Sequence, residues 1–248
     1  AQTAVKRGHT VTLCEKADRL GGLLNDATEL PFKNYMRNYL AWDIRETMAC
    51  GADIRLNTAV DADLIARENP DAVIVATGSV YLKPPIPGIE TTVPVHDADQ
   101  GKIDGQRVVV CGGGLSGCEC ALALAQSGKQ VTVVDMIPAE AFCPNMPIFN
   151  HADLFDQLEK LGVELVGGQK ITAFTAQGVE TVDGDGNARV FPCDAAVNAL
   201  GVKPDNALGL ELLAKYGSEQ VYLVGDCVGK GRNYGDANRE GYQAAMRI

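Results

Sequence analysis

Four residues near the middle of the chain have the types and spacing that bind the phosphates and a ribose of a dinucleotide. Gly112, Gly114 and Gly117 form the pattern G-x-G-x-x-G, and Asp135 follows about 20 residues later. The first glycine permits a tight turn, the second lets backbone approach a pyrophosphate, and the third lets a helix pack closely on a strand. A carboxylate at the end of the next strand can accept hydrogen bonds from both hydroxyls of an adenosine ribose. The stretch therefore predicts a dinucleotide site.

The residues around these glycines predict the strand, turn and helix that such a site requires. "RVVVC" (107–111) is a β-branched run typical of a buried parallel strand, and "QVTVVD" (130–135) supplies the next strand. Between them, the alanine-rich "CECALALAQS" indicates a helix that ends at Gly128. Its free N–H groups and positive dipole end would face the phosphates, so Leu115 and Ser116 join the predicted site.

The residues after Asp135 favour NADH over NADPH. They read "MIPAEA" and contain no Arg or Lys to receive a 2′-phosphate, which the acid would repel. Glu119 lies two residues beyond the last glycine, on the first helical turn, and is a candidate to meet the nicotinamide half. A solvent-facing helix glutamate is the open alternative.

Two internal matches indicate that a related unit precedes this one. "GHTVTLCE", which starts at Gly8, aligns without gaps with "GKQVTVVD" at Gly128, and "DAVIVATG" (71–78) aligns with "DAAVNALG" (194–201) at nearly the same offset. Glu15 is then the counterpart of Asp135 and the ribose-binding acid of the first unit. Its glycines would lie before the first residue, so we expect a βαβ unit that is cut within its first helix and binds its nucleotide weakly.

Composition and turn residues place the remaining elements. Before residue 91 we expect a helix over 1–7, a strand over 10–13, a helix over 31–51, strands over 52–60 and 71–79, and a proline-rich connector over 80–90. After the glycine motif we expect a helix over 149–162 and an antiparallel meander of "VELVGG", "KITAFT", "GVETV" and "ARVFPC". The chain then continues with a parallel strand over 194–201, a second connector over 202–212, a strand over 221–224 and a helix from about Ala237.

Two loops contain residues that could lie against a ligand. Gly21 and Gly22 open a loop in which backbone could approach a ligand, although a plain turn explains them equally well. Asp226 follows Gly225 where the strand over 221–224 meets a loop, a place suited to bind a sugar-alcohol hydroxyl. A turn or capping role for Asp226 is the alternative.

Composition excludes several function classes. The chain has 248 residues, 46% hydrophobic content and a formal net charge of −10, with no basic cluster, which argues against a nucleic-acid partner. No apolar run could span a bilayer, so we expect no membrane partner and a cytoplasmic location. Eight cysteines form no CxxC or CxxxxC pair, and each is expected to be a small buried residue. No acid–base constellation stands out, and we assign neither a catalytic residue nor a metal ligand.

Taken together, these stretches resemble the flavoprotein pyridine-nucleotide reductases. "GGLLNDA", "VIVATGS", "PPIPGI", "VVVCGGGLSGCECALALAQSGKQVTVVDM", "NMPIFNHADLFDQLEKLGVEL" and "VYLVGDCVGKGRNYGDANREGYQAAMRI" look like the C-terminal region of the 2-enoate reductase and 2,4-dienoyl-CoA reductase group. Members of that group are NADH:flavin oxidoreductases related to old yellow enzyme.

The resemblance implies an α/β, three-layer fold with two Rossmann-like dinucleotide-binding domains and a small antiparallel meander. Residues 1–103 and 202–248 would form an FAD domain, interrupted by an NADH domain over 104–201. The cofactor-binding residues that it implies in addition are Glu15, Lys16, Gly21, Gly22, Ala76, Thr77, Gly78, Gly201, Gly225 and Asp226.

The resemblance also implies a function. The chain would be the electron-input module of an ene-reductase, passing electrons from NADH through FAD to an N-terminal TIM barrel of the same parent chain. That barrel would hold FMN, a [4Fe-4S] cluster and an α,β-unsaturated acid or acyl-CoA, so the chain alone would not turn over the final substrate. Transfer of electrons from the flavin to a disulfide is disfavoured, because "LGGLLND" and "GCECAL" stand where disulfide reductases have a cysteine pair. A glutamate synthase small-subunit-like module and a non-catalytic nucleotide-binding fragment are the alternatives.

Overall fold

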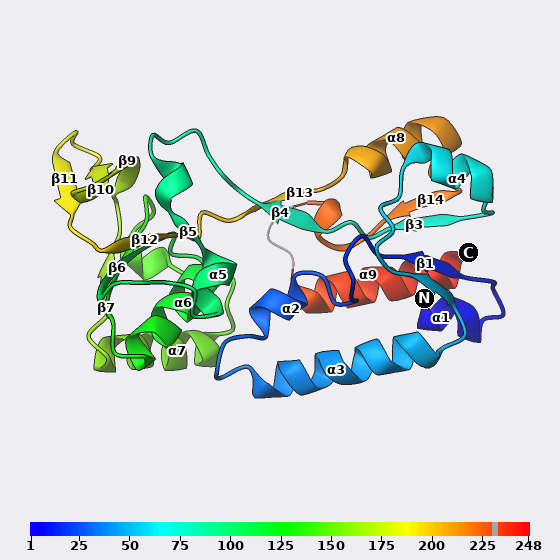
Figure 1. Ribbon diagram of the computed structural model, residues 1–248, viewed down its shortest axis with the longest axis horizontal. Coiled ribbons are helices and arrows are strands. Elements are labelled where there is room, and N and C mark those ends of the chain that lie inside the picture. The colour runs from blue at the N-terminus through cyan, green and yellow to red at the C-terminus, as the bar shows by residue number, and fades with distance from the viewer. Residues whose placement is uncertain (230–232) are drawn as a thin grey trace. The chain divides into compact units, whose positions relative to one another are not determined.

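The chain divides into two compact units, each described here by itself (Figure 1). The computed structural model describes residues 1–229 and 233–248, so 230–232, which belong to the C-terminal sequence match, lie outside the described residues. Unit 1 comprises 1–25, 34–81 and 202–248, and unit 2 comprises 26–33 and 82–201. The compact units thus place 26–33 and 82–103 with the inserted segment, whereas the predicted domains divide at 103. Which unit binds which cofactor stays a prediction.

Unit 2 is built on a five-stranded parallel sheet. Its strands, in spatial order, are β5 (Val93–Pro94), β12 (Ala195–Asn198), β6 (Arg107–Cys111), β7 (Gln130–Val134) and β8 (Glu164–Val166). The predicted strands at 107–111, 130–135 and 194–201 are confirmed. Assigning "VELVGG" to the meander was wrong, because helix α7 (Ile148–Lys160) carries the chain back so that β8 pairs in parallel with β7.

The two faces of this sheet are covered differently. Helices α5 (Val95–Asp99), α6 (Leu115–Gln126) and α7 lie together on one side, and the antiparallel sheet of β9 (Lys170–Thr175), β10 (Gly178–Val182) and β11 (Ala188–Phe191) packs on the other (Figure 1). Strand alternation explains this division, since Val109 and Cys111 join the cluster that contains Phe174 and Val179, while Val108 and Val110 point to the opposite face.

The described residues of unit 1 form three strand pairs and five helices of five residues or more. β1 (Thr12–Cys14) pairs in parallel with β2 (Asp53–Arg55), β3 (Val73–Val75) pairs in parallel with β14 (Val221–Leu223), and β4 (Ser79–Tyr81) pairs antiparallel with β13 (Val202–Pro204). The helices are α1 (Gln2–Lys6), α3 (Asn34–Ala49), α4 (Ala62–Glu68), α8 (Ala207–Tyr216) and α9 (Tyr234–Arg247). The short helices of the chain are α2 (Leu24–Ala27), η1 (Ile89–Thr91), η2 (Ala139–Ala141) and η3 (Gly225–Cys227).

The structure corrects the interpretation of the two connectors. Each contributes a strand to the β4–β13 pair, and the second continues into α8, whose Leu212 is fully buried in the core of unit 1. Helix α9 begins at Tyr234 rather than near Ala237, because Asn233 and Asp236 form a reciprocal capping box there. Of the helices in the described ranges, none combines the length and hydropathy of a membrane span.

Candidate dinucleotide site

The three motif glycines have different surroundings in the turn between β6 and α6. Gly112 has φ 125°, and a Cβ there would lie 2.2 Å from the carbonyl oxygen of Ala199. A Cβ on Gly117 would lie 2.0 Å from the carbonyl oxygen of Gly112, so the close packing of helix on strand requires glycine at this position. Around Gly114 nothing lies within 4 Å of an added Cβ. The turn therefore requires glycine at 112 and 117, whereas the backbone of Gly114 is open.

The N-terminus of α6 faces that open backbone. The helix starts after Gly114 without a side-chain cap, and its first turn contains no acidic residue. Placing Glu119 on the first turn was therefore wrong, because the helix begins at Leu115 and Glu119 lies one turn further on. Leu115 and Ser116 are exposed there, and the first N–H groups of a helix have no partner within the helix. This arrangement suits an anion such as a pyrophosphate.

Asp135 links the end of β7 to the glycine turn. One carboxylate oxygen accepts the N–H of Gly113 at 2.7 Å, and the other accepts the N–H of Ile137 at 3.2 Å. The carboxylate therefore has a fixed orientation beside the turn. Met136, the next residue, is 66% exposed and presents no charge to a 2′-phosphate.

A segment that sequence reasoning missed holds the middle of the turn. A Cβ on Gly113 would lie 2.5 Å from the ring of Phe142, which is 1% exposed. The next residue, Cys143, donates its N–H to the carbonyl of Gly113 at 2.9 Å. The one available signal was the middle glycine of "GGG", Gly113, since the pattern itself requires no glycine there.

We expect Phe142→Leu to weaken NADH binding about tenfold, because a leucine keeps most of the buried volume but not the flat ring against Gly113. Isothermal titration of the variant with NADH measures the effect. Phe149→Leu is the matched control, because Phe149 is 86% exposed on α7. Equal NADH affinity in both variants would contradict a role for Phe142 in holding the turn.

Glu119 is neither solvent-facing nor alone. Its carboxylate forms an ion pair with the ammonium of Lys33, and the two side chains are 15% and 19% exposed. The solvent-facing alternative is therefore wrong, and a contact with the nicotinamide half stays a prediction. Lys33 was not singled out from the sequence, because it lies far from the motif along the chain.

A half-buried acid, Asp99 at the end of α5, interacts electrostatically with this ion pair. Burial raises the pKa of Asp99 from its ordinary value of 3.8 to about 6, against a lowering by the hydrogen bond to the Cys120 thiol. Among the described residues, Oδ1 of Asp99 has no hydrogen-bond partner. Glu119 and Asp26 raise the pKa further, and Lys33 lowers it.

This pKa predicts how stability depends on pH. Because the folded pKa exceeds the unfolded one, charged Asp99 destabilises unit 2 above about pH 6, and the penalty disappears as the pH falls to about 4. Asp99→Asn should therefore raise the melting temperature at pH 8 by about 3 °C and leave it unchanged at about pH 4. Asp97→Asn on the same helix loses the ion pair with Lys102 and should not gain stability at pH 8. A gain that is independent of pH would contradict this account.

In unit 1, the predicted residues near β1 lie at the end of that strand. Glu15 accepts the N–H of Ala17 at 2.8 Å, and Lys16 lies 3.8 Å from the carboxylate of Asp205. Gly21 has φ 118° and Gly22 has φ 51°, so both need glycine for the turn itself. A Cβ on Gly22 would meet open space, whereas one on Gly21 would clash with Asn25.

The carboxyl ends of β3 and β14 bring the other unit 1 residues together. After the buried Val75, Ala76 and Thr77 are exposed, and Gly78 has φ 73° with open space around an added Cβ. Asp226 accepts a hydrogen bond from the hydroxyl of the buried Ser79 at 3.3 Å.

Two further glycines of the prediction have structural roles that the sequence did not indicate. The N–H of Gly225 donates to a carboxylate oxygen of Glu240 on α9 at 2.8 Å. Gly201, in unit 2, has φ 95° and accepts the N–H of Leu82 at 2.9 Å.

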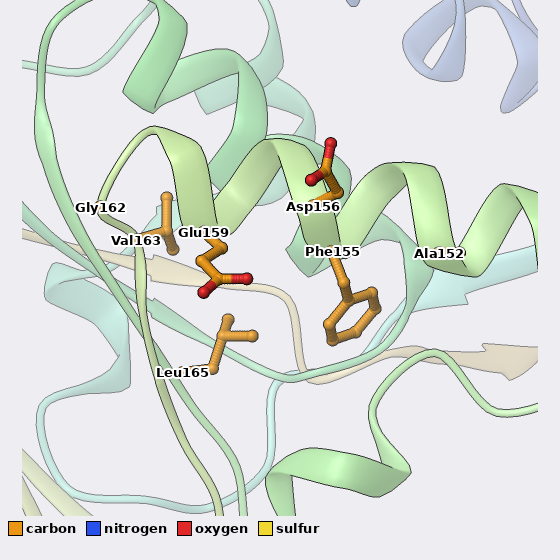
Figure 2. Close-up of a pocket in the computed structure, with 7 residues that line it drawn as sticks. All are labelled: Ala152, Phe155, Asp156, Glu159, Gly162, Val163 and Leu165. Atoms are coloured by element: carbon orange, nitrogen blue, oxygen red, sulfur yellow. The ribbon is translucent and has the colours of Figure 1, made fainter.

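A separate surface depression of about 590 Å³ lies between α7 and β8. Figure 2 shows the ring of Phe155 and the carboxylates of Asp156 and Glu159 at this depression, with Val163 and Leu165 from the following turn and strand. None of the predicted site residues lines it, and its carboxylates would repel phosphates.

The whole architecture matches one protein family. Residues 1–246 match pyridine nucleotide-disulphide oxidoreductase. The chain belongs to this family. It is a family of FAD- and NAD(P)H-binding oxidoreductases, so the α/β fold and the family resemblance are confirmed.

Within the family, the chain is similar to parts of larger enzymes. It is 40% identical to bilirubin reductase of Mediterraneibacter gnavus over 99% of this chain, and 31% identical to cinnamate reductase of Clostridium sporogenes over 100% of it. A solved 2-naphthoyl-CoA reductase complex superposes with a TM-score of 0.87 at 29% identity over the full chain. The chain spans 38%, 37% and 37% of the lengths of these three relatives, and corresponds to their C-terminal regions.

Proposed function

We propose that this chain is the NADH- and FAD-binding electron-input module of a multidomain ene-reductase. NADH binds to unit 2 and FAD to unit 1, and electrons leave for an N-terminal barrel of the same parent chain that holds FMN and a [4Fe-4S] cluster. The observation that carries the proposal is the open turn at Gly114, which combines free helix N–H groups with the fixed carboxylate of Asp135.

The hydrogen-bond geometry of unit 2 favours NADH. Asp135 already accepts the N–H of Gly113 through one oxygen and that of Ile137 through the other, and each carboxylate oxygen retains a further lone pair for a ribose hydroxyl. An NADPH 2′-phosphate would meet this carboxylate and the uncharged Met136, and residues 136–141 contain no Lys or Arg. The side chains of unit 2 thus support NADH as the hydride donor.

The residues of unit 1 fit FAD. Ligands of parallel sheets bind beyond the carboxyl ends of the strands, where Ala76 and Thr77 are exposed and Gly78 has open space around an added Cβ. Asp226, which accepts the hydroxyl of Ser79, would also accept from the ribityl hydroxyls, and Glu15, directly after β1, would accept from the adenosine ribose. When bound, FAD supplies a group that takes up two electrons and releases them singly.

The names of the relatives support a conjugated acceptor. Cinnamate is an α,β-unsaturated acid and 2-naphthoyl-CoA is an acyl-CoA, and the proteins that act on them share this module over its full length. We therefore infer that the parent protein reduces an α,β-unsaturated acid or acyl-CoA.

The acceptor class can be tested on the full-length protein that contains this chain. NADH consumption is followed under anaerobic conditions with cinnamate, 2-naphthoyl-CoA, bilirubin, or glutamine with 2-oxoglutarate, and products are identified by mass spectrometry. We expect reduction of a conjugated acid or thioester. Turnover with glutamine and 2-oxoglutarate alone would overturn the ene-reductase assignment in favour of a glutamate synthase-type module.

A further inference from the structure

Two cysteines contact the same backbone carbonyl in the middle of the glycine turn. The Cys118 thiol, on the first turn of α6, lies 3.7 Å from the carbonyl oxygen of Gly113, and the Cys143 N–H donates to that oxygen at 2.9 Å. The two thiols also lie close enough for each to shift the pKa of the other. Cys118 is 0% and Cys143 2% exposed, but Cys143 is followed directly by the exposed Pro144 and Asn145.

The two thiols differ chemically. The interaction between the two thiols lowers the pKa of Cys143, whereas the same interaction and burial raise the pKa of Cys118. Cys143 is therefore the better nucleophile of the pair and Cys118 the resolving thiol. Cys120, only two residues from Cys118, contacts Asp99 instead.

We propose that Cys118 and Cys143 form a reversible disulfide that weakens NADH binding at the adjacent glycine turn. The regulatory part rests on the proposed NADH site, whereas the disulfide itself does not. The oxidant is hydrogen peroxide, the smallest of the hydroperoxides.

The reaction balances in two steps. The Cys143 thiolate attacks one peroxide oxygen, so that an S–O bond forms, the O–O bond breaks and the released hydroxide takes a proton to become water. The Cys118 sulfur, losing its proton, then attacks the Cys143 sulfenic acid, so that the S–S bond forms and a second water leaves. Two thiols lose two electrons in total, and one peroxide becomes two waters.

The disulfide changes the turn because its geometry differs from that of the thiol pair. An S–S bond is about 2.05 Å long, which is shorter than any non-bonded contact, so the two sulfur atoms must move closer together when it forms. The thiol hydrogen that Cys118 directs at Gly113 is lost, and the backbone of Cys143, which holds the same carbonyl, is pulled toward α6. Gly113 also donates to Asp135, so the displacement reaches the ribose-binding carboxylate.

The disulfide is tested by mass spectrometry on the reduced protein after exposure to hydrogen peroxide. Trypsin places Cys118 in the peptide 108–129 and Cys143 in the peptide 130–160, so the bond is seen as a cross-link between them that dithiothreitol reverses. We expect the cross-link in the wild type and in Cys120→Ser, and its absence in Cys118→Ser and Cys143→Ser. Cys118→Ala and Cys143→Ala replace the serine variants if a buried hydroxyl prevents folding. No cross-link in the oxidised wild type would overturn the proposal.

The consequence is tested by titrating NADH into the same samples. Oxidation should raise the dissociation constant about tenfold in the wild type and in Cys120→Ser, and should leave Cys118→Ser unchanged. A cross-link with unaltered affinity would overturn the regulatory role. If the reduced protein binds no NADH, the proposed function and the regulation both fail. The presence or absence of the cross-link still shows whether the disulfide forms.

Discussion

Replacing Gly114 by glutamate will abolish NADH binding while unit 2 stays folded. The added side chain meets no protein atom within 4 Å of its Cβ, so the fold tolerates it. It places bulk and a negative charge at the N-terminus of α6, where the pyrophosphate would lie. We expect the dissociation constant for NADH to rise more than about 100-fold, which corresponds to ~2.7 kcal/mol.

The matched control for this variant is Gly184→Glu. Gly184 lies in the turn between β10 and β11 of the same unit and has equally open surroundings. Both variants should melt within about 2 °C of the wild type by circular dichroism. If both bind NADH like the wild type, the pyrophosphate does not lie at Gly114.

Asp135→Asn will lower NADH affinity about 100-fold and remove the preference over NADPH. The amide keeps the shape of the carboxylate, but its NH₂ group donates and cannot accept. Only one oxygen then remains to accept both a backbone N–H and a ribose hydroxyl. Hydrogen bonds to charged groups contribute about 1.5–3 kcal/mol each, which gives an effect of this size. The loss of negative charge also removes the repulsion of a 2′-phosphate.

Asp194 offers a control with the same local chemistry at the opposite, amino-terminal end of the parallel strands. Its carboxylate accepts the N–H of Gln106, directly before β6, at 2.9 Å and the N–H of Arg107, the first residue of β6, at 2.8 Å. The Arg107 guanidinium holds the pKa of Asp194 well below its usual range. Asp194→Asn should therefore lower the stability of unit 2 but not its NADH affinity. Similar losses of affinity in both variants would show that Asp135 acts through stability alone.

The sequence predicts the glycine turn well because its signals are local. β-Branched residues, three spaced glycines, an alanine-rich run and an acid follow one another over 107–135, and each has one structural reason. The α/β class follows from two such runs in tandem. The carboxyl ends of β3 and β14 could also be placed, because buried strands that end in small residues form the ligand edge of a parallel sheet.

The missed features depend on contacts between residues distant in sequence or on short elements. Phe142 and Lys33 reach the site from loops whose paths no local pattern determines. β8 has only three residues, so its own sequence did not distinguish a parallel edge strand from a meander. Helix α8, unlike these features, had a local signal, because Leu208, Leu212 and Leu213 have helical spacing. The preceding "VKPDN" led to the interpretation of the whole segment as a connector.

We propose that NADH held at the Gly112–Gly117 turn reduces FAD. The most direct measurement is the visible flavin absorbance of the full-length protein that contains this chain, reconstituted with FAD and mixed with excess NADH under anaerobic conditions. We predict rapid bleaching in the wild type, and bleaching slowed more than about 100-fold in Gly114→Arg and Gly114→Glu at equal FAD content. No bleaching in the wild type, or equal bleaching in all three proteins, would contradict the account.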